Sequence, residues 1–357
     1  MKVRKEKVIN MKLTDREWKE FVIEDIFDIY TGATIKQDEF QEGAIPRITA
    51  SDANNGVSMF TDNLGSQNYR KVTNFISISF LGSVFYQPCE VSLDMKIHGI
   101  KLKNRDFKEN LALFLIPLIK QFTFKYNYGY QLSSSVLRKQ KIMLPVDDNK
   151  NPDFLFMEQY VAEQTVIKKQ KYISFVKETL ESLEILPVVP LSDKEWRAFC
   201  IEDIFNISSG KRLIKDDMKP GVTPFIGATD SGNGITHYIS NRNTSLDKNV
   251  LGVNYNGNGV TIGFYHPYEC LFTDDVKRFH LKNHEDNRYV LLFFKTIILQ
   301  QKSKYNYAYK FNEQRMRRQY IMVPVNDTGE PDYSYMEQYI KNITISKYQA
   351  YLSYSKA

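Results

Sequence analysis

Two kinds of apolar pattern alternate along the chain. Short runs with β-branched or alternating apolar residues occupy 74–80, 141–146 and 319–325, bounded by Gly, Asn or Pro, and these predict strands. The stretches 110–124 and 287–301 are apolar at helical spacing and long enough to form helices. A mixture of strands with helices that pack against them predicts an α+β fold.

A different pattern follows each of these regions. Residues 154–186 contain no Gly or Pro, and an apolar stripe steps by four and three residues through 162, 166, 169, 173, 176, 180 and 183, with Lys at 169. From Tyr333 to the end, Met336, Ile340, Ile343, Ala350 and Tyr354 form a similar stripe that Lys347 interrupts. Each amphipathic helix needs a partner, so we predict that the two pair as an antiparallel coiled coil.

The whole pattern occurs twice. LTDREWKEFVIEDIFDI from Leu13 returns as LSDKEWRAFCIEDIFNI from Leu191, and seven of the ten residues that start at each Trp are identical. The offset between the copies is 178 residues there and 179 later, where KYNYGY at 125 returns as KYNYAY at 304. Solenoid repeats are only about 20–50 residues long, so two whole domains are set in tandem.

Each copy contains a polar loop of the same form. PRITASDANNGV at 46–57 corresponds to TPFIGATDSGNGI at 223–235, with Asp52 matched by Asp230 and Asn-Gly matched in both. The shared positions, Asp52 and Asp230 included, are expected to shape the turn. Positions that differ, above all Arg47 and Asn54, are expected to determine what the loop binds.

Basic and aromatic residues cluster after the first predicted helix of each copy, at 110–124 and 287–301. The KYNY motifs at 125–128 and 304–307 interleave cation, ring and amide groups, and RKQK at 138–141 and RMRRQ at 315–319 follow shortly afterwards. Lys and Arg bind phosphates, and Arg, Asn and Gln can also contact base edges. The predicted DNA contacts are Arg47, Thr49, Ser51, Asn54, Asn55, Lys125, Tyr126, Asn127, Tyr128, Arg138, Lys139, Thr229, Ser231, Asn233, Asn256, Asn258, Lys304, Tyr305, Asn306, Tyr307, Arg315, Arg317 and Arg318.

Composition limits the class of protein. The 357 residues are 42% hydrophobic and 25% charged, as in a soluble globular protein, and a net charge of +6 permits a polyanionic partner without requiring one. The longest apolar run, 111–119, is too short to span a membrane, and the basic start MKVRKEKVINMK lacks a signal peptide's apolar core. Three scattered cysteines fit a reducing compartment, so we expect a cytoplasmic protein.

Candidate catalytic motifs are weak. NPDF at 151–154 resembles a loop of amino-methyltransferases, but the second copy reads EPDY. HLKNH at 280–284 lacks the Glu and third ligand of a zinc protease, so a packing or solvent-facing role is expected for its histidines. The glycines of NGNGVTIG at 256–263 are spaced wrongly for a dinucleotide loop. We therefore expect neither catalysis nor a bound metal or cofactor in this chain.

The order of motifs resembles a known family. Two copies of W..F.IEDIF.I..G, P.I.A.D..NG, KYNY.Y and R.Q.I..PV, each followed by a helix, resemble the specificity (S) subunits of type I restriction-modification systems and their type IIB, BcgI-like relatives. The resemblance implies two target recognition domains, each recognising one half of a bipartite double-stranded DNA site. It implies spacer helices that contact methyltransferase subunits, and restriction subunits as further partners. S-adenosylmethionine and Mg would then bind the partner subunits of a bacterial or archaeal complex.

On this basis the chain divides into six segments: a tail at 1–17, a first recognition domain at 18–153, a central spacer helix at 154–187, a linker at 188–195, a second recognition domain at 196–332 and a C-terminal spacer helix at 333–357. Whether the system is type I or type IIB stays open. A tandem module that binds a sugar or a protein is the alternative to a DNA-binding subunit.

Overall fold

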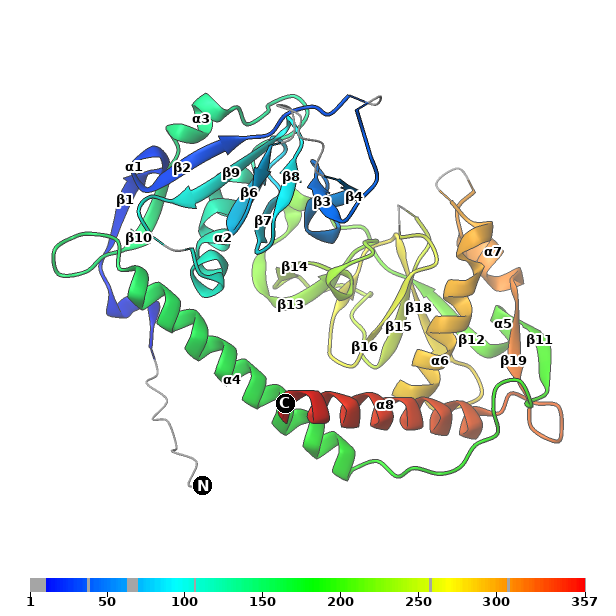
Figure 1. The fold of residues 1–357 in the computed structure, drawn as a ribbon. Helices are drawn as coiled ribbons and strands as arrows, with labels where there is room; N and C mark the ends of the chain where they lie inside the picture. Colours follow the sequence, from blue (N-terminus) through cyan, green and yellow to red (C-terminus); the bar gives the residue numbers. More distant parts are fainter. Residues whose placement is uncertain are drawn as a thin grey trace, which may run out of the picture. The chain divides into compact units, whose positions relative to one another are not determined.

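The protein folds into two units. The computed structural model describes residues 11–36, 39–62, 70–105, 107–256, 259–306 and 309–356. The chain divides after Tyr172 into unit 1 and unit 2. Each unit combines sheets with helices that cover them, as expected for an α+β fold (Figure 1).

Unit 1 builds two four-stranded sheets and a two-stranded sheet. Its elements are η1 (Leu13–Asp15), β1 (Trp18–Val22), α1 (Ile23–Ile26), β2 (Phe27–Thr31), β3 (Ile45–Ile48), η2 (Asn54–Gly56), β4 (Val57–Thr61), β5 (Lys71–Val72), β6 (Phe75–Ser79), β7 (Val84–Gln87), β8 (Val91–Leu93), β9 (Ile97–Leu102), α2 (Glu109–Thr123), α3 (Ser134–Arg138), β10 (Lys141–Pro145) and α4 (Phe154–Glu181). The strand orders are β2-β9-β6-β7, β4-β3-β8-β5 and β1-β10. All pairs are antiparallel except β3 with β8.

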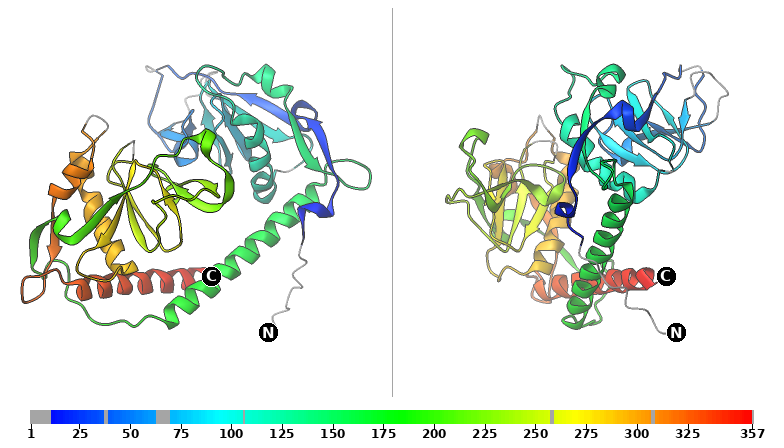
Figure 2. Two further views of the ribbon diagram at one scale, coloured as in Figure 1. Left: turned by 180° about the vertical axis from the view of Figure 1, so that it is seen from behind. Right: turned by 90° about the vertical axis from the view of Figure 1, so that its left-hand side faces the viewer.

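Helix α2 contributes a large part of the main core of unit 1. It lies against β6 and β7 (Figures 1 and 2), and its buried face includes Leu111, Leu115 and Ile119. These positions recur at intervals of four residues, so one face of the helix is apolar. The buried Ile76 and Ile100 of the sheet complete the contact.

Unit 2 repeats the same order of elements. They are β11 (Trp196–Cys200), α5 (Ile201–Ile204), β12 (Phe205–Ser209), η3 (Lys215–Asp217), β13 (Pro220–Ile226), η4 (Gly232–Gly234), β14 (Ile235–Ile239), β15 (Val250–Asn254), β16 (Gly263–His266), β17 (Leu271–Phe272), β18 (Val276–Leu281), α6 (Arg288–Leu299), η5 (Gln300–Lys304), α7 (Glu313–Arg318), β19 (Tyr320–Pro324) and α8 (Tyr333–Lys356). The strand orders are β12-β18-β15-β16, β14-β13-β17 and β11-β19, which match those of unit 1 except that the described part of unit 2 has no counterpart of β5.

Side-chain packing repeats as closely as the topology. Trp18 stacks on Phe114 with ring centroids 6.2 Å apart, and Trp196 stacks on Phe293 at the same distance. Each indole Nε1 donates a 3.0 Å hydrogen bond to the carbonyl oxygen five residues earlier, in Leu13 or Leu191. The predicted tandem repeat is therefore confirmed at the level of fold.

The long helices differ in detail from the prediction. Helix α4 ends at Glu181, six residues before the predicted end at 187. Within unit 2, the chain after α4 contacts α8. The Nε2 of Gln338 donates to the carbonyl oxygen of Glu184, and the Nδ2 of Asn342 donates to that of Leu186. Extended chain thus contacts α8 where a continued helix was expected.

The predicted apolar stripes describe the buried faces only in part. Val176 is fully buried as expected, whereas Val166 of the same stripe is 48% exposed. On α8 the predicted Met336 is fully buried, but Tyr335 and Ile345 outside the stripe are buried as well, and the predicted Ile343 and Tyr354 are 40% and 81% exposed. The N-terminal half of α8 packs on α6, so its buried face does not follow a single coiled-coil seam.

Candidate nucleic-acid interface

The opening loop of unit 1 is a rigid turn. Asn54, Asn55 and Gly56 have consecutive φ values of 49°, 53° and 79°, in the left-handed region that Asn and Gly adopt at least cost. The N–H of Thr49 donates to the Gly56 carbonyl over 2.9 Å and closes the loop. Gly56 is buried, and a Cβ there would lie 3.1 Å from the Ile48 side chain. The turn therefore holds Asn54 and Asn55 on the surface.

Neighbouring loops brace this turn. The Ser83 hydroxyl donates to the Asp52 carboxylate, as expected for a structural role of Asp52, and the Nε2 of Gln87 donates to the Asn55 carbonyl over 2.8 Å. Gly82, next to Ser83, accepts a 2.9 Å hydrogen bond from the Thr123 hydroxyl at the end of α2. The polar loop and the KYNY segment after α2 therefore lie along one edge of unit 1.

Arg47 does not lie on that edge. Its side chain is 4% exposed. It donates to the Ser92 hydroxyl over 2.7 Å, to the Ala33 carbonyl over 2.8 Å and to the Asp94 carboxylate over 3.1 Å. The prediction that Arg47 contacts DNA is therefore wrong for this structure, because every interaction of its guanidinium is internal. Phe225 takes the same position in unit 2 and is 3% exposed.

The KYNY segments divide into inward and outward residues. Tyr126 and Tyr305 are 4% and 9% exposed and belong to the cores, so their predicted contact with DNA is also wrong. The Asn127 Oδ1 accepts from the N–H of Gly129 and of Tyr130 over 2.9 and 3.1 Å. Lys125 is exposed, and Tyr128 is 80% exposed.

Unit 2 repeats this arrangement. The Tyr305 hydroxyl donates to Gln319 over 2.8 Å, and the Asn306 Oδ1 accepts from the N–H of Tyr309 over 2.9 Å. Lys304 donates to Gln301 over 2.8 Å. The predicted residues Asn258 and Tyr307 lie outside the described part of the chain.

The second polar loop keeps the turn and changes its side chains. Gly232, Asn233 and Gly234 have φ values of 58°, 54° and 77°, and the Nδ2 of Asn233 donates to the Tyr268 hydroxyl over 2.8 Å. Ser231 and Asp230 are exposed, while Thr229 is half-buried with its carbonyl bound by Asn254. Asn256 is half-buried and donates to Asp275 over 3.2 Å. In unit 1, Thr49 and Ser51 are likewise half-buried, and the Ser51 hydroxyl accepts from the N–H of Ala53.

The basic clusters lie at the ends of two short helices. Arg138 and Lys139 are exposed where α3 ends. In unit 2, Arg317 is bound by the Glu313 carboxylate at 2.7 Å and donates to the Ile207 carbonyl, whereas Arg318 is exposed. Arg315 lies 3.7 Å from the centroid of the Tyr309 ring. The basic side chains at the end of α3 are therefore exposed to a ligand, whereas at α7 only Arg318 is exposed to the same degree.

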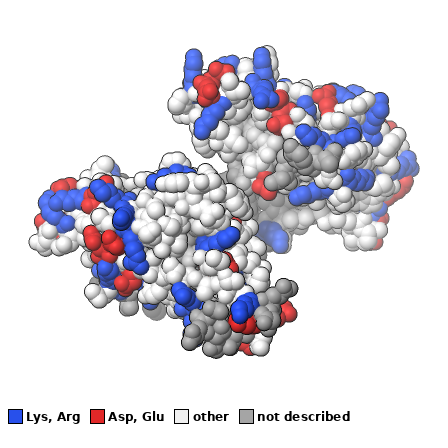
Figure 3. Space-filling view, turned by 90° about the horizontal axis from the view of Figure 1, so that it is seen from above, with Lys and Arg blue, Asp and Glu red and all other residues white. Residues whose placement is uncertain are grey.

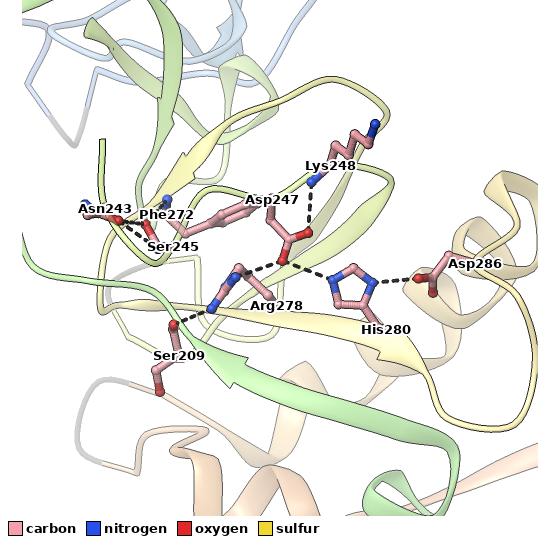
Figure 4. A network of polar contacts seen from close by, with 9 residues as sticks. All are labelled: Ser209, Asn243, Ser245, Asp247, Lys248, Phe272, Arg278, His280 and Asp286. Carbon is pink, nitrogen blue, oxygen red and sulfur yellow. Dashed lines mark hydrogen bonds and ion pairs between the residues drawn. The ribbon is translucent and has the colours of Figure 1, made fainter. Parts of the chain in front are cut away.

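A charged network that the sequence analysis did not predict ties the sheet of unit 2 together (Figure 4). His280 on β18 contacts Asp286 through Nδ1 at 2.6 Å and Asp247 through Nε2 at 3.0 Å. Arg278 also binds Asp247, at 2.8 Å, and donates to the Ser209 carbonyl. Unit 1 has Lys101 in place of His280. This difference between the two copies was the sign in the sequence that the network belongs to unit 2.

This network predicts a pH-dependent stability of unit 2. Hydrogen bonds to Asp247 and Asp286 raise the pKa of His280 from 6.5 to about 9. The stabilisation is therefore complete below pH 6.5 and lost as the pH rises through 9. Its upper limit is about 3 kcal/mol at 1.36 kcal/mol per pKa unit, reduced by solvent. We expect Tm of unit 2 to fall more between pH 7 and 10 in the native protein than in a His280→Gln variant.

Tryptophan fluorescence can measure this transition. In a Trp18→Phe background, Trp196 reports the melting of unit 2, because its ring packs on Phe293 in the core of that unit. If the native protein and His280→Gln show the same change of Tm with pH, the network does not titrate as described.

Membrane-spanning helices and metal-binding clusters are both absent from the described ranges. Among these residues, no helix combines the length and apolarity needed to cross a bilayer. Within the same ranges, no group of three or more His, Cys, Asp or Glu side chains is arranged to hold a metal ion.

A family model and a known protein match most of this chain. The family model described as the type I restriction modification DNA specificity domain matches residues 15–174 and 193–351. The specificity subunit S.BcgI of a type II restriction enzyme from Heyndrickxia coagulans is 40% identical over 323 residues, which are 90% of this chain and 92% of that protein.

Solved structures of S subunits also match. The type I S subunit from M. genitalium matches with a TM-score of 0.45 at 15% identity, over 96% of this chain and 94% of that one. The HsdS subunit from Thermoanaerobacter tengcongensis matches with a TM-score of 0.32 at 13% identity, over 95% and 92%. From the two matches to the family model and the 40% identical relative, this chain belongs to the family of restriction-modification DNA specificity subunits, with one specificity domain in each half.

Proposed function

We propose that each unit binds one half of a bipartite, asymmetric DNA site and thereby directs the other subunits of a restriction-modification complex. One observation carries this proposal. Residues 110–146 contain five Lys or Arg and no Asp or Glu, and the corresponding residues 289–325 contain seven Lys or Arg and one acidic residue, Glu313. The same positive segment therefore recurs at the same place in two units.

This charge distribution suits a phosphate backbone. Fixed Lys and Arg side chains release counterions from DNA when they neutralise phosphates, and this supplies much of the affinity. Figure 3, in which the elements at the top of Figure 1 face the viewer, shows several groups of Lys and Arg. Arg138, Lys139 and Arg318 are exposed and are the clearest candidates for phosphate contacts.

The two half-sites should differ in sequence. The turns at 54–56 and 232–234 share their left-handed backbone, but Asn54 of unit 1 corresponds to Gly232 of unit 2. An exposed Asn can bind adenine through two hydrogen bonds, and Gly offers no side chain. The same scaffold would therefore present different groups to the two half-sites.

We further propose that this chain is not itself catalytic. Methyltransferase subunits would contact the helices α4 and α8 and would bind S-adenosylmethionine, with Mg held by the partner subunits. The strong similarity to S.BcgI favours a type II system over a type I system. An autonomous methyltransferase would, in contrast, bind S-adenosylmethionine without any partner subunit.

Methylation mapping tests the proposal directly. The chain would be produced together with its methyltransferase partner in a host without other modification systems, and methylated bases would be located by sequencing. We expect one motif made of two unlike half-sites at a fixed separation. Methylation without any sequence preference, or a single continuous motif, would contradict the proposal.

Salt dependence separates DNA binding from the sugar- or protein-binding alternative. Affinity that rests on phosphate contacts falls steeply as the salt concentration rises. Binding of the assembled complex to its mapped site should therefore weaken by orders of magnitude between about 50 and 200 mM salt. A nearly flat dependence would favour a neutral ligand.

A further inference from the structure

Three aromatic side chains project into solvent after α2 of unit 1. Phe124, Tyr128 and Tyr130 are 82%, 80% and 55% exposed. Large exposed rings so close together in sequence are unfavourable in water, and exposed aromatic surface often marks a binding site. Tyr126 of the same segment belongs to the core of unit 1, whereas Phe124 and Tyr128 take no part in that core.

The tip that presents these rings is preorganised. Asn127 and Tyr130 exchange two backbone hydrogen bonds of 3.0 Å, and the Asn127 side chain caps the same turn. The Tyr130 ring stacks on the buried Tyr126 ring at 5.2 Å between centroids. Tyr128 meets Phe80 edge-on at 6.3 Å. One face of Tyr130 is thus fixed against the core, while more than half of its surface stays open.

The equivalent ring in unit 2 has an arginine against it. Tyr309 stacks on Tyr305 at 5.6 Å, and the Arg315 guanidinium lies 3.7 Å from the Tyr309 centroid. A 2.7 Å hydrogen bond to the Lys310 carbonyl holds Arg315 there. The residue of unit 1 that corresponds to Arg315 is Val136, which cannot make these contacts. Arg315 thus contacts the Tyr309 ring where unit 1 has only Val136, although the two tyrosines are exposed to similar extents, Tyr309 to 49% and Tyr130 to 55%.

The surroundings favour a nucleobase as the missing occupant. The tip lies in the segment without acidic residues, with exposed Lys125 beside it, and Lys96 lies 4.9 Å from the Phe80 ring that Tyr128 contacts. Each base of DNA is attached to a backbone of negative phosphates, and stacking of bases on aromatic side chains beside cations is how single-stranded nucleic acid is commonly bound. A base still stacked in a duplex exposes only its edges, so the bound base must leave the stack.

We propose that Tyr130, flanked by Tyr128, stacks on one nucleobase that leaves the duplex in the half-site bound by unit 1, and that Arg315 replaces this base in unit 2. The inference rests on the proposed DNA-binding function and adds a difference in mechanism between the half-sites. Recognition by unit 1 would then include the energy of opening one base pair, which depends on its sequence.

A double-mutant cycle between protein and DNA tests the stacking. The assembled complex with its methyltransferase partner would be titrated with its mapped site, and single abasic nucleotides would be placed at each position of both half-sites. Removing the base at one position of one half-site should change the DNA affinity of the native complex by one factor and that of the Tyr130→Ala complex by another. These two factors should differ about tenfold. Tyr130→Phe should behave as the native protein, because it keeps the ring.

Because unit 1 has Val136 where unit 2 has Arg315, substituting each residue by the other gives two matched variants. Val136→Arg should cover Tyr130 and remove the same coupling without deleting the ring, whereas Arg315→Val should leave the coupling at that position unchanged. Tyr320→Ala removes another exposed tyrosine, 62% exposed, and should have no effect there. Specific binding without coupling at any position would overturn the stacking inference and leave the proposed function intact. Failure of the native complex to prefer the mapped site would instead refute the proposed function.

Discussion

Replacing Lys125, Arg138 and Lys139 together by alanine should flatten the salt dependence of DNA binding by the assembled complex. Each lost phosphate contact lowers the slope of log affinity against log salt by about 0.9, so three contacts would lower it by about 2.7. All three side chains are exposed, and they lie in a segment without acidic residues. The measurement is a series of binding titrations on the mapped site between about 50 and 200 mM salt.

A matched triple variant controls for the loss of net charge. Arg16, Lys71 and Lys150 are also basic residues of unit 1, but each is paired with a carboxylate, in Asp153, Glu90 and Glu17 respectively. Replacing these three should leave the slope close to that of the native complex, since surface pairs of this kind contribute little. Equal slopes for both triple variants would show that the open cations do not contact DNA.

Arg47→Ala should destabilise unit 1 by about 3 kcal/mol, the low end for removing one partner of a buried ion pair. The substitution leaves Asp94 without its cation, with the carboxylate side chain only 26% exposed, and it removes the donors to Ser92 and Ala33. The measurement is denaturant unfolding of a Trp196→Phe background, in which Trp18 reports unit 1 through its contact with Phe114.

Arg70→Ala is the control for this prediction. Arg70 is an exposed arginine of the same unit that binds Thr31, and its removal should cost well under 1 kcal/mol. Below the unfolding transition, the Arg47→Ala complex should still recognise the native DNA sequence. A change of DNA sequence preference with unchanged stability would instead identify Arg47 as a base-contacting residue.

The elements of each unit followed from local pattern. The predicted helices at 110–124 and 287–301 are α2 and α6, and the strands expected at 141–146 and 319–325 are β10 and β19. Their apolar spacing reflects burial on one face, which local sequence records directly. Strand pairing was not accessible in this way. The parallel contact of β3 with β8 joins residues more than 40 positions apart, and no turn between them specifies it.

The candidate site was predicted less well, for an identifiable reason. Tyr126 and Tyr305 are identical in both copies and proved to be core residues, as the shared Asp52 position proved to have a structural partner. Arg47 differs between the copies, but its counterpart is Phe225, an apolar residue expected to be buried. A residue that is identical in both copies, or whose counterpart in the other copy is apolar, was thus the one to expect in a structural role.

The sequence by itself determined the duplication, the α+β class, the family and the position of the two polar loops. Each of these depends on residue order and spacing, which are visible without coordinates. Only the tertiary structure decided which side chains in those loops face outward. Arg47 turns inward because Ser92 on β8 and Asp94 just after that strand lie beside it, and α7 places Arg315 against the Tyr309 ring. Such directions depend on neighbours distant in sequence, and the packing of the folded chain sets them.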